Sequence, residues 1–478
     1  MIPCCSNLNR FDNNYNFRFW KGDALLRLLL ILAGLLLIPE MAMAEEFKSL
    51  GLTGTERGIY TVLVFLVAYG FVMAEEFTHL RKSKPVIFAA AVIWAHVAIL
   101  AHDAGIPSEE LHQAFEHDLK EYAELMLFLL VAMTYINSMS ERNVFEALRS
   151  WLIRKQFGYK QLFWITGIIT FFLSAVADNL TSALLVGAVV MAVGADNEKF
   201  VSVGFVNLVI AANAGGAFCP FGDITTLMVW QAGYAEFFDF FKLFIPSVVN
   251  FVVPAFFMAQ AIPNGQPLAT NEAPVQLKPG AFQVCGLFLF TIILAVSFKQ
   301  FLHLPPFMGM MLGLSILMLY GYYLKVNFPD ETTGARFDIF EKVKEAEWDT
   351  LLFFFGVVFA VGGLGYIGYL QLLSGAMYDG LGATTANILV GIISAIVDNI
   401  PVMFAVLNMN LDMDLYQWLL VTLTAGVGGS LFSVGSAAGV ALMGQSNHKY
   451  TFFSHLKWTP VIAAGYAASI FTHYLING

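Results

Sequence analysis

Long apolar stretches recur along almost the whole chain, and they constrain its fold more than any other feature. Three of them cover about residues 58–76, 86–102 and 122–139, and roughly 20 helical residues are needed to cross the hydrocarbon of a bilayer. Only 13% of the 478 residues are charged and 58% are hydrophobic. Because backbone in lipid must satisfy its own hydrogen bonds, the sequence predicts an all-α polytopic membrane protein.

The first 44 residues have the order of a secretory signal peptide. Basic residues precede the short apolar run LLLILAGLLLI, and Ala42, Met43 and Ala44 follow it as a cleavage site. An uncleaved first helix is the alternative. Cleavage would leave the mature N-terminus outside the bacterial inner membrane.

Two later apolar stretches are interrupted near their middles. The first, residues 161–194, contains Asp178 and Asn179, which predicts a hairpin that enters and leaves the membrane on one side. The second, about residues 200–232, contains NAGGAFCPFGD, whose glycines and proline forbid a continuous helix. Non-helical backbone at membrane depth survives only beside protein or a wet cavity. We therefore expect both interruptions to line a cavity.

The same order of segments recurs after a polar linker at residues 262–280, which we expect to be cytoplasmic. SAVADN is matched by SAIVDN, which predicts a second hairpin at about residues 384–407, and GGAFCPFGD is matched by GGSLFSVGS. Three further matches keep the same order, as a duplication would. The sequence predicts two repeats, residues 45–261 and 281–478, each with five crossings and one hairpin.

The distribution of lysine and arginine predicts that the two repeats are inverted. In the first repeat, basic residues follow the first and third spans, and an acidic loop that includes His117 follows the second. In the second repeat the equivalent of the acidic loop is basic, and residues 366–387 contain no lysine or arginine. Basic loops stay in the cytoplasm. Inverted repeats with broken helices are typical of secondary transporters, whose sites lie near the midplane of the bilayer.

Polar and acidic residues gather at the interruptions. A charged side chain at the bilayer centre costs about 2.5 to 3.5 kcal/mol, so Asp178 and Asp398 should face a shared cavity. Small hard cations need several oxygen ligands, which these side chains supply. We expect Asp178 and Asp223 to carry the cation and the proton, and Asp398 to be a third carrier, a structural partner or a hairpin cap. The candidate ion-binding residues are Asp178, Asn179, Thr181, Asn213, Asp223, Thr225, Thr226, Ser394, Asp398, Asn399, Ser433 and Ser436.

The motifs resemble those of the NhaD-type Na+/H+ antiporters of the ion transporter superfamily. The resemblance rests on ADNLTSALL, VDNIPVMFA, NAGGAFCPFGDITT and GGSLFSVGSAAG and covers nearly the whole chain after the first 44 residues. It implies re-entrant hairpins, discontinuous helices, and export of Na+ or Li+ in exchange for H+. Dicarboxylate carriers of the superfamily typically have Ser-Asn-Thr at the hairpin tips. The Asp-Asn pairs here, with Pro401 in place of the second threonine, favour a cation over an anion.

Three further ionisable residues are secondary candidates. Glu124 and Asp349 begin equivalent spans, where solvated helix ends are the alternative to a transport role, and His117 belongs to the acidic loop, where simple solvation is the alternative. We expect no cofactor, no transition metal and no nucleic acid partner. The expected substrates are Na+, Li+ and H+, the surroundings are membrane lipid, and a homodimer is left open.

Two other functions remain as alternatives to cation exchange. One is transport of an organic anion or arsenite by a member of the same superfamily. The other is an intramembrane aspartyl protease, because PFGD at residues 220–223 and the pair Tyr378 and Asp379 approximate that class's motifs in reversed order. The sequence GxxxxGK[ST] of a P-loop is absent, so ATP-driven pumping is not supported.

Overall fold

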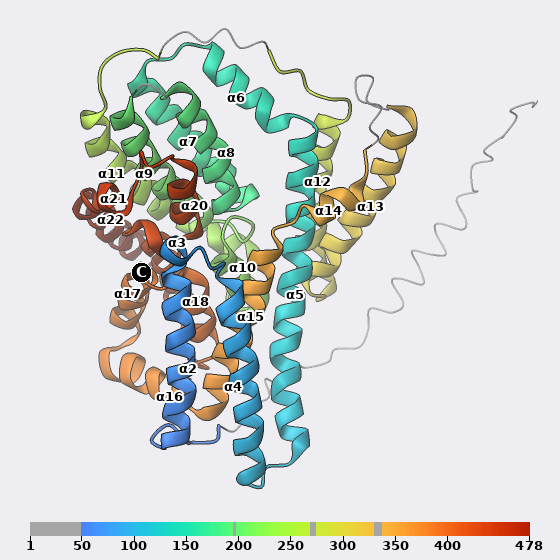
Figure 1. Ribbon diagram of the computed structural model, residues 1–478, viewed down its shortest axis with the longest axis vertical. Coiled ribbons are helices and arrows are strands. Elements are labelled where there is room, and N and C mark those ends of the chain that lie inside the picture. The colour runs from blue at the N-terminus through green and yellow to red at the C-terminus, as the bar shows by residue number, and fades with distance from the viewer. Residues whose placement is uncertain (1–48, 195–196, 268–273, 329–336) are drawn as a thin grey trace, which may run out of the picture. The chain divides into compact units, whose positions relative to one another are not determined.

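The computed structural model describes residues 49–194, 197–267, 274–328 and 337–478, which form helices and loops without a strand (Figure 1). Within these ranges nine helices are long and apolar enough to cross a membrane. The prediction of an all-α polytopic membrane protein is therefore confirmed. The predicted signal peptide, residues 1–44, and part of the predicted linker lie outside the described residues.

Residues 49–261, which we call the first half, follow the predicted order of spans and breaks. The predicted hairpin is two helices separated at Asp178, and the second interrupted stretch is two helices separated by residues 217–223. The helices are α2 (Glu56–Met73), α3 (Glu75–Thr78), α4 (Ser83–Asp103), α5 (Ser108–Glu141), α6 (Val144–Arg154), α7 (Tyr159–Ala177), α8 (Asn179–Val193), α9 (Glu198–Gly216), α10 (Ile224–Ala232), η1 (Phe237–Leu243) and α11 (Phe244–Ala261).

Residues 281–478, which we call the second half, also contain two interrupted helix pairs. One helix pair is separated around Asp398, and another is separated by residues 429–436. The helices are α12 (Ala281–Leu302), α13 (Pro306–Asn327), α14 (Ile339–Lys344), α15 (Trp348–Ile367), α16 (Tyr369–Ser374), η2 (Gly375–Asp379), α17 (Ala383–Ser394), α18 (Asn399–Leu407), α19 (Leu415–Gly428), η3 (Ser433–Gly435), α20 (Ala437–Gln445), α21 (Phe452–Leu456) and α22 (Thr459–Asn477).

The expectation of an acidic loop between the second and third spans is wrong for most of its length. Helix α5 begins at Ser108 and runs for 34 residues, so His117 lies on a helix. Glu109 and Glu110 occupy the first turn, where negative charge interacts favourably with the positive end of the helix dipole. The following residues include several leucines, glutamates and alanines, which are strong helix formers, and these local preferences outweigh the polarity that suggested a loop.

The two halves pack on each other through reciprocal pairs of helices. Helix α8 of the first half contacts α20 of the second, and α18 of the second half contacts α10 of the first. In the same way α4 contacts α15 while α13 contacts α5. Figure 1 shows α4, α15 and α5 running side by side. One helix of each broken pair, α10 or α20, therefore packs against a helix from the opposite half, α18 or α8.

Two glycines allow the first helix of each broken pair, α9 or α19, to lie directly against α7 or α17 of the same half. A Cβ atom at Gly215 of α9 would lie 2.0 Å from the carbonyl oxygen of Phe171 in α7. A Cβ atom at Gly428 of α19 would lie 2.1 Å from the carbonyl oxygen of Gly391 in α17. These glycines occupy equivalent places in GGAFCPFGD and GGSLFSVGS. Backbone contact of this kind is what small residues provide between helices in membranes.

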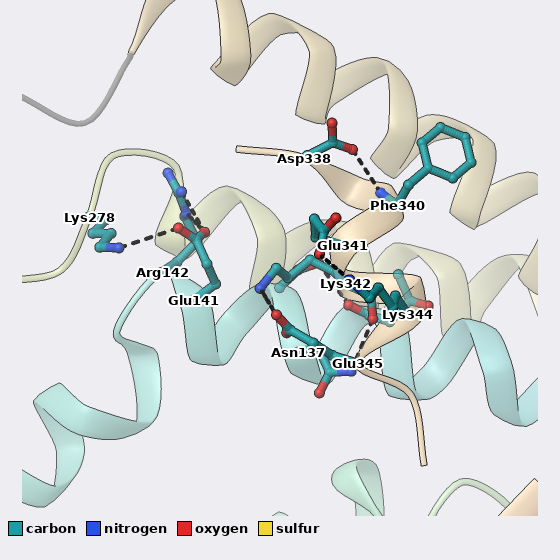
Figure 2. A network of polar contacts seen from close by, with 12 residues as sticks. Asn137, Glu141, Arg142, Lys278, Asp338, Phe340, Glu341, Lys342, Lys344 and Glu345 are labelled. Atoms are coloured by element: carbon teal, nitrogen blue, oxygen red, sulfur yellow. Dashed lines mark hydrogen bonds and ion pairs between the residues drawn. The ribbon is translucent and has the colours of Figure 1, made fainter. Parts of the chain in front are cut away.

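A polar network ties the C-terminal end of α5 to the chain that enters the second half and to α14 (Figure 2). Arg142, which caps the C-terminus of α5, pairs with Glu141 and donates to the carbonyl oxygen of Pro279 at 3.2 Å. Lys278 Nζ lies 3.3 Å from Glu141 Oε1. Asn137 Nδ2 donates to the carbonyl oxygen of Lys342 in α14 at 3.1 Å. The end of the predicted linker is therefore fastened to α5.

Candidate functional site

Asp178 lies at the break between α7 and α8 and caps α8. Its Oδ1 accepts from the backbone N–H of Thr181 and its Oδ2 from the hydroxyl of Thr181, both at 2.8 Å. The backbone φ of Asp178 is 57°, an angle that non-glycine residues adopt rarely and mostly where the surrounding structure requires it. The Asp-Asn-Leu-Thr order thus places a carboxylate at the start of a helix inside an apolar segment.

Asp223 is the polar centre of the described site. It caps α10 by accepting from the backbone N–H of Thr225 at 3.2 Å, and its side chain is buried. Asn179 Nδ2 lies 3.4 Å from Asp223 Oδ2, and Asn399 Nδ2 lies 3.2 and 3.1 Å from the two carboxylate oxygens. Amides from the α7–α8 and α17–α18 pairs therefore meet on one carboxylate, which they stabilise when it is ionised.

Asn213 connects this centre to the second half. Its Oδ1 accepts from Asn179 at 3.2 Å, and its Nδ2 donates to the hydroxyl of Ser430 at 3.0 Å. Ser430 was not predicted as a site residue, although it lies within GGSLFSVGS, where the first half has Ala217. The presence of a serine in one motif where the matching motif has an alanine was the signal that could have identified Ser430.

The loop that carries Ser430 is held by a buried histidine. His455 Nε2 donates to the carbonyl oxygen of Ser430 at 2.8 Å, since a carbonyl can only accept, and His455 Nδ1 accepts from the hydroxyl of Tyr450 at 2.7 Å. His455 lies on the short helix α21, outside the candidate spans. Burial lowers the pKa of His455 to about 4, so the imidazole is neutral near neutral pH.

A cavity of about 230 Å³ brings most of the first-half candidates together. Asp178, Asn179, Thr181 and Asp223 line it together with Asn399 of the second half. Asn137, Ser140, Glu347 and Thr350 also line it, and apart from Lys82 the rest of the wall is apolar. The cavity joins both first-half aspartates, as the sequence analysis expects.

The hydroxyl groups of three candidates form hydrogen bonds with the backbone. Thr226 Oγ1 donates to the carbonyl oxygens of Asp223 at 2.6 Å and Cys219 at 3.2 Å, which holds the loop before α10. Ser394 Oγ donates to the carbonyl oxygen of Ala425 at 2.8 Å. Ser436 caps α20 by accepting from the backbone N–H of Gly439 at 3.3 Å. These residues shape the backbone around the site.

Two other candidate hydroxyls are buried without a hydrogen-bond partner among the described residues. They are Thr225 Oγ1 and Ser433 Oγ. Thr225 follows Asp223 within the first turn of α10, and Ser433 lies within the break between α19 and α20. A buried hydroxyl that bonds to nothing costs free energy, so each is a place where a ligand would find an unused oxygen.

We expect Asp178 and Asp398 to share a cavity, but Asp398 is not among the residues that line the cavity of Asp178 and Asp223. It lines a second cavity of about 400 Å³ together with Tyr69, Glu75 and Ser436. Asp398 Oδ2 forms an ion pair with Lys82 Nζ at 3.4 Å. Lys82 was missed as a site residue because its position before α4 indicated an ordinary cytoplasmic charge.

The three secondary candidates lie in two places away from Asp223. Glu124 and His117 line a third cavity of about 190 Å³ together with Lys120 and Glu121. Asp349 instead accepts from the hydroxyl of Ser83 at 2.5 Å. Among the described residues no group of three or more His, Cys, Asp or Glu side chains could hold a metal ion.

Known proteins similar to this chain decide its family. It is 53% identical over 457 residues to the Na(+)/H(+) antiporter NhaD of Vibrio cholerae, an alignment that covers 91% of this chain and 95% of the relative. The chain belongs to the NhaD family. A second NhaD, from Alkalimonas amylolytica, is 52% identical over 95% of this chain and 98% of its own length. Sodium/proton antiporter 1 of Arabidopsis thaliana is 31% identical over 88% of this chain and 73% of its own length.

Two further comparisons concern a family model and a solved structure. Residues 24–426 match the family CitMHS, described as citrate transporter. Among solved structures, Neisseria gonorrhoeae MtrF aligns with a TM-score of 0.47 and 13% identity over 76% of this chain and 84% of that chain, a score too low to establish a shared fold. As an NhaD family member the protein is a transporter rather than an enzyme, which leaves the aspartyl protease alternative without support.

Proposed function

We propose that the protein exchanges Na+ or Li+ for H+ across a bacterial inner membrane, and that the cavity containing Asp178 and Asp223 is the exchange site. The identity to NhaD antiporters over nearly the whole chain supports the reaction. The location of the exchange site is supported by the arrangement at Asp223, where amides from two helix pairs converge on one buried carboxylate.

Exchange at this site follows from competition. A carboxylate that binds a proton loses the negative charge that attracts a cation, so Na+ and H+ exclude each other at Asp178 and Asp223. Asn179 and Asn399 point their amide nitrogens at Asp223, which leaves each amide oxygen available for a cation. The unused hydroxyl of Thr225 adds one more oxygen close to the carboxylate.

The proposed transport cycle needs a site that opens to each side in turn. We include in the proposal that α7–α8 and α17–α18 are re-entrant hairpins, and that residues 45–261 and 281–478 are inverted repeats. The reciprocal contacts of α8 with α20 and of α18 with α10 support this symmetry, as does the reversal of basic loops in the sequence. Movement of one repeat against the other would then expose the site alternately.

An organic anion is the competing substrate class, favoured by the description of the matched CitMHS family. A carboxylate substrate would meet Asp178 and Asp223 in the same cavity. The basic side chain that lines this cavity, Lys82, is already paired with Asp398. The charge around the cavity therefore favours a cation.

Ion flux in everted vesicles tests the proposal. We expect Na+ and Li+ to release protons from acidified vesicles that contain the wild-type protein, and Asp178→Asn and Asp223→Asn to abolish this release. Asp412→Asn is the matched control, because Asp412 lies exposed in the loop after α18. Uptake of succinate without any cation-dependent proton movement would overturn the proposal in favour of the anion alternative. Normal exchange by either aspartate variant would remove that residue from the site.

A further inference from the structure

The two aspartates at the helix breaks are capped differently. Asp178 receives two hydrogen bonds from Thr181, one from its backbone N–H and one from its hydroxyl. The second half has Pro401 at the matching place, and proline has neither a backbone N–H nor a hydroxyl. Asp398 accordingly makes no capping hydrogen bond to α18, and its Oδ1 is buried without a partner among the described residues.

Lys82 supplies the positive charge that stabilises the Asp398 carboxylate in place of a helix cap. It immediately precedes α4 in the first half, yet its Nζ lies 3.4 Å from Asp398 Oδ2 and 4.4 Å from the centre of the Phe353 ring. The side chains of Lys82 and Asp398 are only 16% and 12% exposed. A partly desolvated ion pair is less screened by salt than a surface pair, and the aromatic face adds a second attraction for the ammonium group.

The position of this pair links it to the proposed exchange site. Lys82 lines both the cavity of Asp178 and Asp223 and the adjoining cavity of Asp398. The residue after Asp398 is Asn399, whose amide holds Asp223. A change in the charge or the position of Asp398 would therefore act directly next to Asn399, which contacts Asp223.

We propose that Lys82 is a positioning residue for ion exchange that sets the affinity for the transported cation. Its ammonium group replaces the cap that Pro401 cannot provide and cancels the charge of Asp398. Asp178 and Asp223 then remain as the carboxylates that attract the cation, and Asn399 stays in place against Asp223. This inference rests on the proposed Na+/H+ exchange.

The inference predicts opposite effects from removing the two partners. Lys82→Met leaves an uncompensated negative charge beside the site, so the apparent KM for Na+ should fall. Asp398→Asn leaves an uncompensated positive charge, so the apparent KM should rise. For one unit charge at the edge of a partly hydrated cavity we expect each change to be about 3- to 10-fold.

The experiment measures Na+-dependent proton release in everted vesicles at alkaline pH, where protons compete least. Lys82→Arg keeps the charge and should keep the KM close to that of the wild type. The double variant Lys82→Met with Asp398→Asn restores neutrality and should bring the KM back between those of the single variants, whatever its maximal rate. Lys84→Met is the matched control, because Lys84 lies two residues away and is exposed, and its KM should not change.

Each outcome distinguishes this inference from the proposed function. A shift of KM in the same direction in both single variants, or a Lys82→Met variant that matches Lys84→Met, would overturn the role of Lys82. Absence of Na+-dependent proton release from the wild type would instead overturn the proposed function. If a single variant is inactive in vesicles, the order of affinities is measured on purified protein, as the Na+ concentration that gives half of the maximal thermal stabilisation.

Discussion

Asn399 Nδ2 lies 3.1 Å from Asp223 Oδ2, so a side chain at the start of α18 holds a carboxylate at the start of α10. The two residues are 176 positions apart in the sequence and belong to different halves. The contact between α10 and α18 brings them together. Any movement of one half against the other would act directly on this pair.

Asn399→Ala should weaken Na+ binding while the protein still folds. A hydrogen bond to a charged group contributes about 1.5 to 3 kcal/mol, which corresponds to a KM for Na+ about 10- to 100-fold higher. The measurement is Na+-dependent proton release in everted vesicles. Asn408→Ala is the matched control, because Asn408 donates to the carbonyl oxygen of Phe404 within its own helix. A KM unchanged by Asn399→Ala would mean that the amide has no role in cation binding.

Gly428→Ala should destabilise the protein and impair exchange. The added methyl group would lie 2.1 Å from the carbonyl oxygen of Gly391, and a backbone atom cannot move aside as a flexible side chain can. Overpacking of this kind costs about 1 to 3 kcal/mol, visible as a lower melting temperature in detergent. Gly444→Ala in α20 is the control, because nothing lies within 4 Å of its Cβ position. Equal melting temperatures for the two variants would contradict the close approach of α19 to α17.

Acidification should destabilise the protein partly through His455. The folded protein keeps this imidazole neutral down to about pH 4, whereas the ordinary pKa is 6.5. The unfolded chain therefore binds the proton first, and stability falls as the pH drops from about 6.5 to about 4. The gap between the two pKa values corresponds to about 3 kcal/mol. His455→Gln should show a smaller loss of melting temperature over this pH range than the wild type, and an equal loss would show that His455 does not contribute.

Arg142→Met should weaken the connection between α5 and the chain that follows the linker. The Arg142 side chain is only 6% exposed, and its guanidinium group lies 4.8 Å from the centre of the Phe337 ring. Its loss leaves Glu141 with Lys278 as partner, and we expect a cost of about 2 kcal/mol in the free energy of unfolding. Lys344→Met is the control, because its ion pair with Glu341 is exposed and such pairs contribute about 0 to 1 kcal/mol. Similar melting temperatures for both variants would contradict a structural role for Arg142.

The sequence predicts the broken helices because their breaks have strong local causes. The Asp-Asn pair at Asp178 and the glycines around Gly215 are incompatible with a continuous apolar helix, and the matching motifs near Asp398 and Gly428 repeat the signal. The extent of α5 was not predicted, because its polar N-terminal turns resemble a loop in composition. Helix propensity and the helix dipole decide that segment instead.

The partners of the site residues were harder to predict than the residues themselves. Lys82 lies 316 positions from Asp398, and a basic residue next to a span ordinarily indicates only orientation. Its role depends on the packing of α4 near the α17–α18 pair, which no local pattern encodes. Ser430 was missed for the opposite reason, because a serine in a glycine-rich turn is common enough to pass as a turn residue.

The most direct test of the account measures protons released when Na+ binds to the purified protein in detergent. If Na+ and H+ exclude each other at Asp178 and Asp223, Na+ binding should release protons, and the Kd for Na+ should rise as the pH falls. Asp223→Asn should lose both effects. Binding of Na+ to the wild-type protein without proton release, and with an affinity independent of pH, would contradict the central claim.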